Sequence, residues 1–382
     1  MTENAEFDDL RAGVQLVCSD FPGEYWRGLE PDSYPTEFVA AITDAGFLGA
    51  LIPEEFGGGG ATLTEASIIL EEISASGGNP AACHAQMYVM GTVLRHGSAE
   101  QKQQYLPEIA AGRLRLQAFG VTEPGAGSET TRIRTRAEQV ADGWRINGQK
   151  IWTSRALYSD LMLLLARTTP YDKCAKPTEG LSTFLIDMRE LEGLTIKPIK
   201  TMINHNTTEV FFDNCLIPTE ALIGEVGKGF RYILDGMNAE RILIASECIG
   251  DGRFLLDRAV AYANERIVFD KPIGANQGVQ FPLARAYAQL RAADLVRFEA
   301  ARKYDAHLKC AEEANMAKFL ASEASWAAAN ASLDTHGGFG FAVEYDIERK
   351  FRETRLYQVA PISNNLVLAY LGQHALGLPK SY

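Results

Sequence analysis

Two adjacent charged residues lie in a segment whose neighbours are almost all apolar. The segment 236–245 reads Gly-Met-Asn-Ala-Glu-Arg-Ile-Leu-Ile-Ala, and helical spacing places Glu240 and Arg241 on an apolar face. Burying charges is costly unless they are paired or serve a site. This pattern indicates that Glu240 is a general base in a dry pocket and that Arg241 holds a polar or anionic part of a ligand. A structural ion pair with other helices is the alternative interpretation.

A second stretch, 116–128, reads as a buried strand that runs into a turn containing Pro124, Gly125 and Gly127. These glycines allow the backbone to approach a ligand closely, and the turn has N–H groups without a strand partner. Such a turn can hydrogen-bond the polar edge of a flat ring. Polar and apolar residues alternate after Asp142-Gly143, which predicts a hairpin in which Trp152 covers one face of the bound ring. An ordinary hairpin with a core Trp is the alternative.

The elements that must position these residues follow the order helices, strands, helices. Residues up to about 115 have helical periodicity, strands are expected from 116 in a small antiparallel sheet, and long helices return after a glycine-containing linker at 218–230. This order is not a βαβ alternation, and the chain has no GxGxxG or GxxxxGK[ST] loop, which argues against a Rossmann or P-loop site. We expect three domains, at 1–115, 116–228 and 229–382.

Composition narrows the possible partners. The net charge of −12 disfavours nucleic acid and anionic membrane surfaces, because both select for basic patches. The six cysteines are scattered and no His pair has zinc-ligand spacing, so free thiols and no metal site are expected. The acidic amino terminus lacks the apolar region of a secretory signal, and no stretch is apolar enough to span a bilayer. A cytoplasmic location is the default expectation.

Residues 121–128 (Val-Thr-Glu-Pro-Gly-Ala-Gly-Ser) and 147–152 (Asn-Gly-Gln-Lys-Ile-Trp) resemble the flavin-binding segment of the acyl-CoA dehydrogenase family. The resemblance covers nearly the whole chain. It implies an α+β, mainly α fold with an N-terminal helical domain, a middle β domain and a C-terminal four-helix bundle, and it implies FAD as cofactor. The cofactor-binding residues carried over are Phe119, Val121, Thr122, Gly127, Ser128, Trp152, Thr153, Ser154, Arg266, Gln277, Gly337, Gly338 and Ser363.

The same resemblance assigns the catalytic and substrate-binding residues. Most members carry a catalytic glutamate near the carboxyl end, but this sequence has Pro361 there. In isovaleryl- and long-chain-type members the base directly precedes an arginine, and here that residue is Glu240. The implied reaction is α,β-dehydrogenation of an acyl-CoA thioester to the 2-enoyl-CoA, in which Glu240 removes the α-proton and the β-hydride passes to flavin N5. The residues expected to bind substrate are Ser128, Asn238 and Arg241.

The resemblance also implies partners. These are an electron-transfer flavoprotein and further copies of the chain in a homotetramer, with a role in fatty acid metabolism. Arg266 is expected to reach the FAD diphosphate of a neighbouring subunit. Three further positions depart from the family pattern: Arg155, Asp270 and Asp334. Arg155 either alters the flavin edge or only reaches solvent.

Two rival interpretations remain open. Pro361 is compatible with a related flavoenzyme of different chemistry, such as a desulfinase, an oxidase or a monooxygenase. A non-catalytic protein that binds CoA or flavin is the second alternative.

Overall fold

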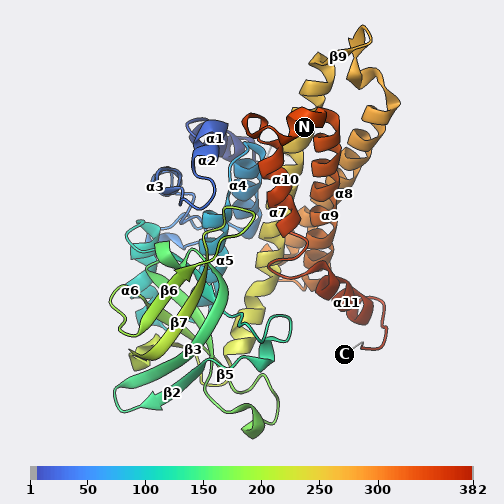
Figure 1. Ribbon diagram of the computed structural model, residues 1–382. Coiled ribbons are helices and arrows are strands. Elements are labelled where there is room, and N and C mark those ends of the chain that lie inside the picture. The colour runs from blue at the N-terminus through green and yellow to red at the C-terminus, as the bar shows by residue number, and fades with distance from the viewer. Residues whose placement is uncertain (1–6, 381–382) are drawn as a thin grey trace. The chain divides into compact units, whose positions relative to one another are not determined.

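The computed structural model describes residues 7–380, and the backbone packs into two compact units. The sheet unit comprises residues 31–61 and 81–237. The bundle unit comprises residues 7–30, 62–80 and 238–380. Figure 1 shows the elements of both units along the chain. The predicted domain boundaries at 115/116 and 228/229 stay a prediction.

The sheet unit is built on one mixed eight-stranded sheet with the order β6-β7-β3-β2-β4-β5-β8, in which β1 pairs with β4. The expectation of an antiparallel sheet is therefore wrong, because β4 runs parallel to both β1 and β2. The strands are β1 (Leu116–Gly120), β2 (Arg136–Val140), β3 (Gly143–Ser154), β4 (Leu161–Arg167), β5 (Leu181–Asp187), β6 (Leu194–Pro198), β7 (Thr207–Ile217) and β8 (Leu222–Ile223). The hairpin expected at Asp142-Gly143 is present as the antiparallel pair β2–β3.

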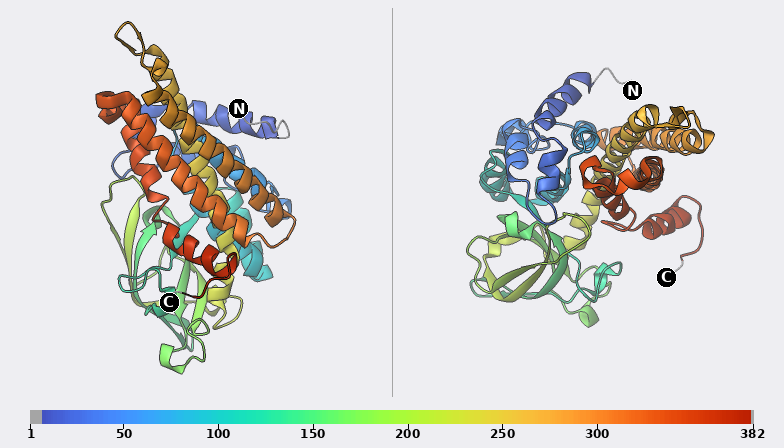
Figure 2. Two further views of the ribbon diagram at one scale, coloured as in Figure 1. Left: turned by 90° about the vertical axis from the view of Figure 1, so that its right-hand side faces the viewer. Right: turned by 45° about the horizontal axis from the view of Figure 1, so that its top comes forward.

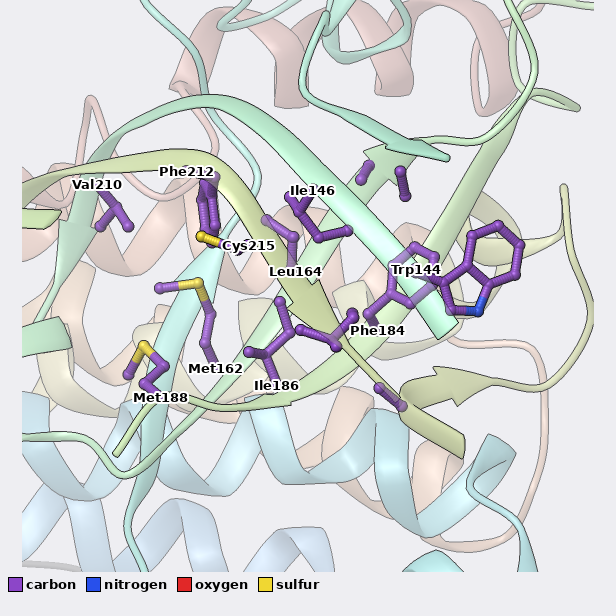
Figure 3. Packing of buried hydrophobic residues seen from close by; sticks show 14 of the residues in the cluster. Trp144, Ile146, Met162, Leu164, Phe184, Ile186, Met188, Val210, Phe212 and Cys215 are labelled. Atoms are coloured by element: carbon purple, nitrogen blue, oxygen red, sulfur yellow. The ribbon is translucent and has the colours of Figure 1, made fainter. Parts of the chain in front are cut away.

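Strand β4 is buried along its whole length because both faces of the sheet are covered. Its residues Met162 and Leu164 enter one core with Trp144, Phe184 and other apolar side chains (Figure 3). The alternate residues of β4 enter a second core, against helices α5 (Ala81–His96) and α6 (Ala99–Ala110). A strand buried on both faces gives a continuous apolar run in sequence, as seen at 161–166. Helix α3 (Thr36–Asp44) and the start of α7, residues 229–237, also belong to this unit.

The bundle unit is almost entirely helical. Its helices are α1 (Asp8–Ser19), α2 (Gly23–Gly28), α4 (Leu63–Ala75), most of α7 (Gly229–Glu265), α8 (Gln277–Asp305), α9 (Ala311–His336), α10 (Ile347–Leu356) and α11 (Asn364–His374). Alanines such as Ala324 and Ala328 of α9 are buried against apolar residues of α7 and α8, so the helices lie close together. Figure 2 shows α8 and α9 side by side. A two-stranded hairpin, β9 (Ile267–Val268) and β10 (Lys271–Pro272), connects α7 to α8.

The expected α+β, mainly α fold is confirmed. None of the helices within residues 7–380 is long and apolar enough to cross a membrane.

Candidate active site

The glycine-rich turn that follows β1 lies directly beside the end of β3. The Ile151 N–H donates to the Thr122 carbonyl at 2.9 Å, and Glu123 and Ala126 exchange backbone hydrogen bonds across the turn. Gly127 and Ser128 are exposed, whereas Val121 and Thr122 are half-buried. The structure therefore brings the predicted flavin residues of 119–128 together with those of 152–154 within the sheet unit.

A buried ion pair holds this turn, and it was not predicted from the sequence. The Lys150 ammonium donates to Glu123 and to the Val121 carbonyl, both at 2.9 Å. The Glu123 carboxylate also accepts from the backbone N–H groups of Arg134 and Thr135, at 2.6 and 2.8 Å. Burial lowers the pKa of Lys150 to about 8, while Glu123 raises it. The pair thus fixes the turn against β3 and against residues 134–135.

The end of β3 is irregular at the predicted flavin-covering residue. Trp152 adopts φ 61°, and the pairing of β3 with β7 shifts register between Ile151 and Thr153. This bulge leaves the Trp152 side chain 58% exposed. Next to it, the Thr153 hydroxyl is buried and has no hydrogen-bond partner among residues 7–380. An exposed aromatic plane beside an unsatisfied hydroxyl is suited to a flat ligand with polar edges.

Arg155 is buried, so the expectation that it only reaches solvent is wrong. Its side chain is 4% exposed and its backbone is left-handed, with φ 59°. The guanidinium Nη2 lies 3.2 Å from His205 Nδ1. Because arginine has only donors, His205 Nδ1 must accept, which makes the imidazole neutral. Burial, together with Arg155, holds the pKa of His205 well below its ordinary value. Arg155 therefore fastens the end of β3 to the segment before β7.

In the bundle unit, Glu240 lies on α7 with an exposed fraction of 1%. Arg241 is half-buried, and its Nη1 donates to Asn238 Oδ1 at 3.3 Å. Burial lowers the pKa of Arg241, and the neighbouring Glu240 opposes this shift. The predicted burial of this helix face is confirmed, since Ile244 and Cys248 are buried as well.

The segment between α10 and α11 contains Pro361, which is exposed. Its first residue, Tyr357, donates a hydrogen bond to Asp251 of α7 at 2.9 Å. At its other end, the Ser363 hydroxyl caps α11 by accepting from Leu366 N–H at 3.4 Å. This segment is therefore fastened to α7 at its start and closed by a helix cap at its end.

Four of the five remaining predicted cofactor residues lie at the end of the bundle unit that carries the β9–β10 hairpin. Tyr262 of α7 stacks on His336 at 4.5 Å and lies 6.3 Å from the Phe339 ring, which brings the end of α7 next to the glycine loop. Arg266 follows Tyr262 by one turn, and Gln277 begins α8 at the same end; Gly337 and Gly338 form the loop. All four residues are exposed. Ser363 caps α11, and Figure 1 shows α11 toward the end of the bundle unit opposite to β9.

Gly337 and Gly338 present open backbone. Gly337 adopts φ 58°, a conformation that favours glycine, and a Cβ at either position would meet no atom of residues 7–380 within 4 Å. Exposed backbone of this kind beside an arginine is suited to a phosphate group. Asp334, in the last turn of α9, is exposed as well.

Comparison with known proteins identifies the family. The profiles of the acyl-CoA dehydrogenase N-terminal, middle and C-terminal domains match residues 5–113, 118–215 and 227–365. The chain belongs to the acyl-CoA dehydrogenase family. It is 34% identical over 386 residues to acyl-CoA dehydrogenase fadE12 of Mycobacterium bovis, an alignment that covers 100% of this chain and 98% of that protein. It is 33% identical to the mouse mitochondrial short-chain specific acyl-CoA dehydrogenase, over 98% of this chain and 92% of that protein.

Solved structures agree with this assignment. The glutaryl-CoA dehydrogenase complex with glutaryl-CoA superimposes with a TM-score of 0.92 and 30% identity, and covers 100% of this chain and 98% of that chain. The complex of PigA with FAD and proline has a TM-score of 0.91 over 99% of this chain and 100% of that chain, but its 23% identity shows the fold alone.

The predicted enzyme class, an oxidoreductase of the acyl-CoA dehydrogenase family, is confirmed, and so is FAD as the cofactor. The residues of this chain fit that group. The unsatisfied Thr153 hydroxyl and the exposed Trp152 offer polar and aromatic contacts for a flavin ring, and the open Gly337-Gly338 backbone offers N–H groups for a diphosphate.

Proposed function

We propose that this family member catalyses FAD-dependent α,β-dehydrogenation of an acyl-CoA thioester to the 2-enoyl-CoA, with Glu240 as the base. One observation carries the proposal: Glu240 is a buried carboxylate directly before Arg241 on α7, whereas residue 361, where most members have the base, is proline. A proline cannot accept a proton, so the base must come from elsewhere in the chain. Burial strengthens a carboxylate as a base because the charged form loses its hydration.

In this proposal the residues of the protein remove the α-proton and orient the substrate. Glu240 accepts the α-proton, so that the α C–H bond breaks while a carboxyl O–H bond forms. Arg241, which is oriented by Asn238, holds a polar part of the substrate. Ser128 of the glycine turn is a further residue that we propose binds substrate. Bound FAD supplies the acceptor for the β-hydride at flavin N5.

The residues that hold FAD come from both units. Phe119, Val121, Thr122, Gly127 and Ser128 of the turn and Trp152, Thr153 and Ser154 of β3 contact the flavin. Arg266, Gln277, Gly337 and Gly338 bind the diphosphate of a neighbouring copy in a homotetramer, and Ser363 contributes from the start of α11. A guanidinium suits a diphosphate because it is bidentate and permanently charged. We further propose an electron-transfer flavoprotein as electron acceptor, a cytoplasmic location and a role in fatty acid metabolism.

Lys150→Met is expected to weaken FAD binding about tenfold or more. The substitution removes two charge-assisted hydrogen bonds and leaves Glu123 buried without its cation, so that the flavin turn loosens. FAD dissociation, followed by fluorescence on dilution of the holoenzyme, measures the effect. Lys197→Met is the matched control, because Lys197 is an exposed lysine on β6 of the same sheet. Unchanged FAD affinity in Lys150→Met would contradict the role of the pair.

The reaction product distinguishes the proposed dehydrogenase from a related flavoenzyme of different chemistry. Pro361 favours, as a second candidate, a related oxidase or other flavoenzyme with the same fold. Incubation of the holoenzyme with saturated acyl-CoAs and an artificial electron acceptor is expected to yield an enoyl-CoA two mass units lighter, without a requirement for O2. Turnover that occurs only with stoichiometric consumption of O2, or a product that has gained oxygen, would favour the rival.

A further inference from the structure

A row of exposed arginines follows directly on the glycine turn of the sheet unit. The row consists of Arg132, Arg134 and Arg136; their side chains are exposed, whereas the residue between each pair is buried. Within residues 128–136 these three arginines stand against one acid, Glu129, in a chain whose net charge is −12. A local excess of positive charge on an acidic protein favours the binding of an anionic ligand.

Hydrogen bonds hold the arginine row against the turn that contains Ser128. The backbone N–H of Arg134 donates to the Glu123 carboxylate at 2.6 Å, and the Thr130 hydroxyl donates to the Gly127 carbonyl at 3.3 Å. Glu123 also belongs to the buried ion pair that fixes the turn against β3. The row therefore lies beside Ser128, the residue of this turn that binds substrate in the proposed function.

An aromatic ring from another loop lies against the first arginine of the row. The guanidinium carbon of Arg132 lies 4.4 Å from the centre of the Tyr171 ring, and that of the buried Arg167 lies 5.4 Å from the same centre. Arg167 is fixed in turn, because it donates to the carbonyls of Thr131 at 2.5 Å and Ile133 at 3.1 Å. The Tyr171 ring and the Arg132 guanidinium are planar groups of the kind on which nucleotide bases stack.

The three arginines differ in how far their charge is already neutralised. Arg132 pairs with Glu129 at 2.9 Å, and Arg136 pairs with Glu138 at 3.0 Å. Arg134 is exposed and forms no ion pair with any residue of the described range 7–380. Its guanidinium is therefore available for a bidentate contact with a phosphate group.

A free guanidinium beside a planar stacking surface matches the nucleotide end of CoA, an adenosine that carries a 3′-phosphate and a 5′-diphosphate. We propose that Arg134 binds the phosphate groups of CoA and that Tyr171, together with Arg132, receives its adenine ring. This inference rests on the proposed function, because it takes an acyl-CoA as the substrate. FAD has the same adenine and diphosphate chemistry, but in the proposed function its diphosphate is bound by Arg266 and the Gly337-Gly338 backbone.

Binding of free CoA to the holoenzyme tests the inference without turnover, with isothermal titration calorimetry as the measurement. Arg134→Gln is expected to raise the Kd of CoA about five- to tenfold, since one exposed charge-assisted contact is lost. Tyr171→Ala is expected to raise it about fivefold or more, because the stacking surface is lost. Acyl-pantetheine thioesters lack the nucleotide, so their kcat/KM should be the same in the wild type and in both variants.

Two further variants separate a local contact from the charge of the whole surface. Arg134→Lys keeps the charge and is expected to retain most of the affinity for CoA. Arg145→Gln is the matched control, because Arg145 is an exposed arginine of β3 that lies opposite Glu138 near the turn of the β2–β3 hairpin. Its Kd for CoA should match that of the wild type, and FAD dissociation should be unchanged in Arg134→Gln.

The outcomes separate this inference from the proposed function. An unchanged Kd of CoA in Arg134→Gln and Tyr171→Ala would refute the nucleotide site, and so would an equal loss of affinity in Arg145→Gln. Weaker FAD binding with unchanged CoA affinity in Arg134→Gln would assign the arginine row to the cofactor instead. If CoA binding responds as expected but no acyl-CoA reduces the flavin, the nucleotide site is supported and the proposed reaction fails.

Discussion

Glu240→Gln is expected to lower kcat for acyl-CoA oxidation by about 10²–10⁴-fold, the usual contribution of a general base. Glutamine has nearly the same shape as glutamate but cannot accept the α-proton. Steady-state turnover with an artificial electron acceptor measures the loss, and the absorbance of bound FAD shows whether the cofactor is retained.

Glu247→Gln provides the matched control. Glu247 is a second buried glutamate of α7, two turns beyond Glu240, and it faces Cys248 and Tyr357. Its substitution removes a buried acid from the same helix without removing the proposed base, so turnover should stay within about tenfold of the wild type. If Glu240→Gln and Glu247→Gln lose activity equally, the loss reflects the packing of α7 and the assignment of the base is wrong.

Lys350→Met is expected to destabilise the bundle unit by about 3–5 kcal/mol, the range for removing one partner of a buried ion pair. Lys350 of α10 is fully buried and donates to Asp251 Oδ1 at 2.7 Å. It also pairs with Glu353 at 2.9 Å. Without the lysine, the buried carboxylates of Asp251 and Glu353 lose the cation that both of them contact. Urea unfolding of the holoenzyme, followed by circular dichroism at fixed protein and FAD concentrations, measures the loss.

The double variant Asp251→Asn, Lys350→Met tests the cause. Asparagine can still accept the hydrogen bond from Tyr357, but it carries no charge, so part of the lost stability should return. Lys303→Met serves as the control, because its ion pairs with Glu299 and Glu313 are partly exposed and such a pair contributes about 1 kcal/mol or less. A Lys350→Met protein within about 1 kcal/mol of the wild type would show that the buried pair contributes no net stability.

Features that depend on local periodicity could be predicted from the sequence. The apolar face of α7 and the β2–β3 hairpin lie where the residue pattern predicts them. Each depends on residues within a few positions of one another. The glycine turn of 121–128 was likewise found from its residue types, whereas its hydrogen bond to Ile151 of β3 joins residues that are far apart in sequence.

Features that depend on distant partners were missed. Helix α10 was not predicted, because a segment as charged as 347–356 reads as solvent-exposed surface. In the structure, Arg349, Lys350 and Glu353 are buried, since partners more than 90 residues away, including Asp251 and the Gly77 carbonyl, satisfy their charges. The Glu123–Lys150 pair and the burial of Arg155 were missed for the same reason. A search for charged residues within otherwise apolar strands would have found Lys150.

The central claim is that a saturated acyl-CoA delivers a hydride to FAD in this protein. Anaerobic titration of the purified holoenzyme with a panel of saturated acyl-CoAs of different length and branching tests it most directly, with the flavin absorbance as readout. We predict that at least one acyl-CoA bleaches the flavin band in the wild type, and that Glu240→Gln abolishes this bleaching. Bound flavin that no saturated acyl-CoA reduces would contradict the account and would indicate a family member that keeps the fold but performs another reaction.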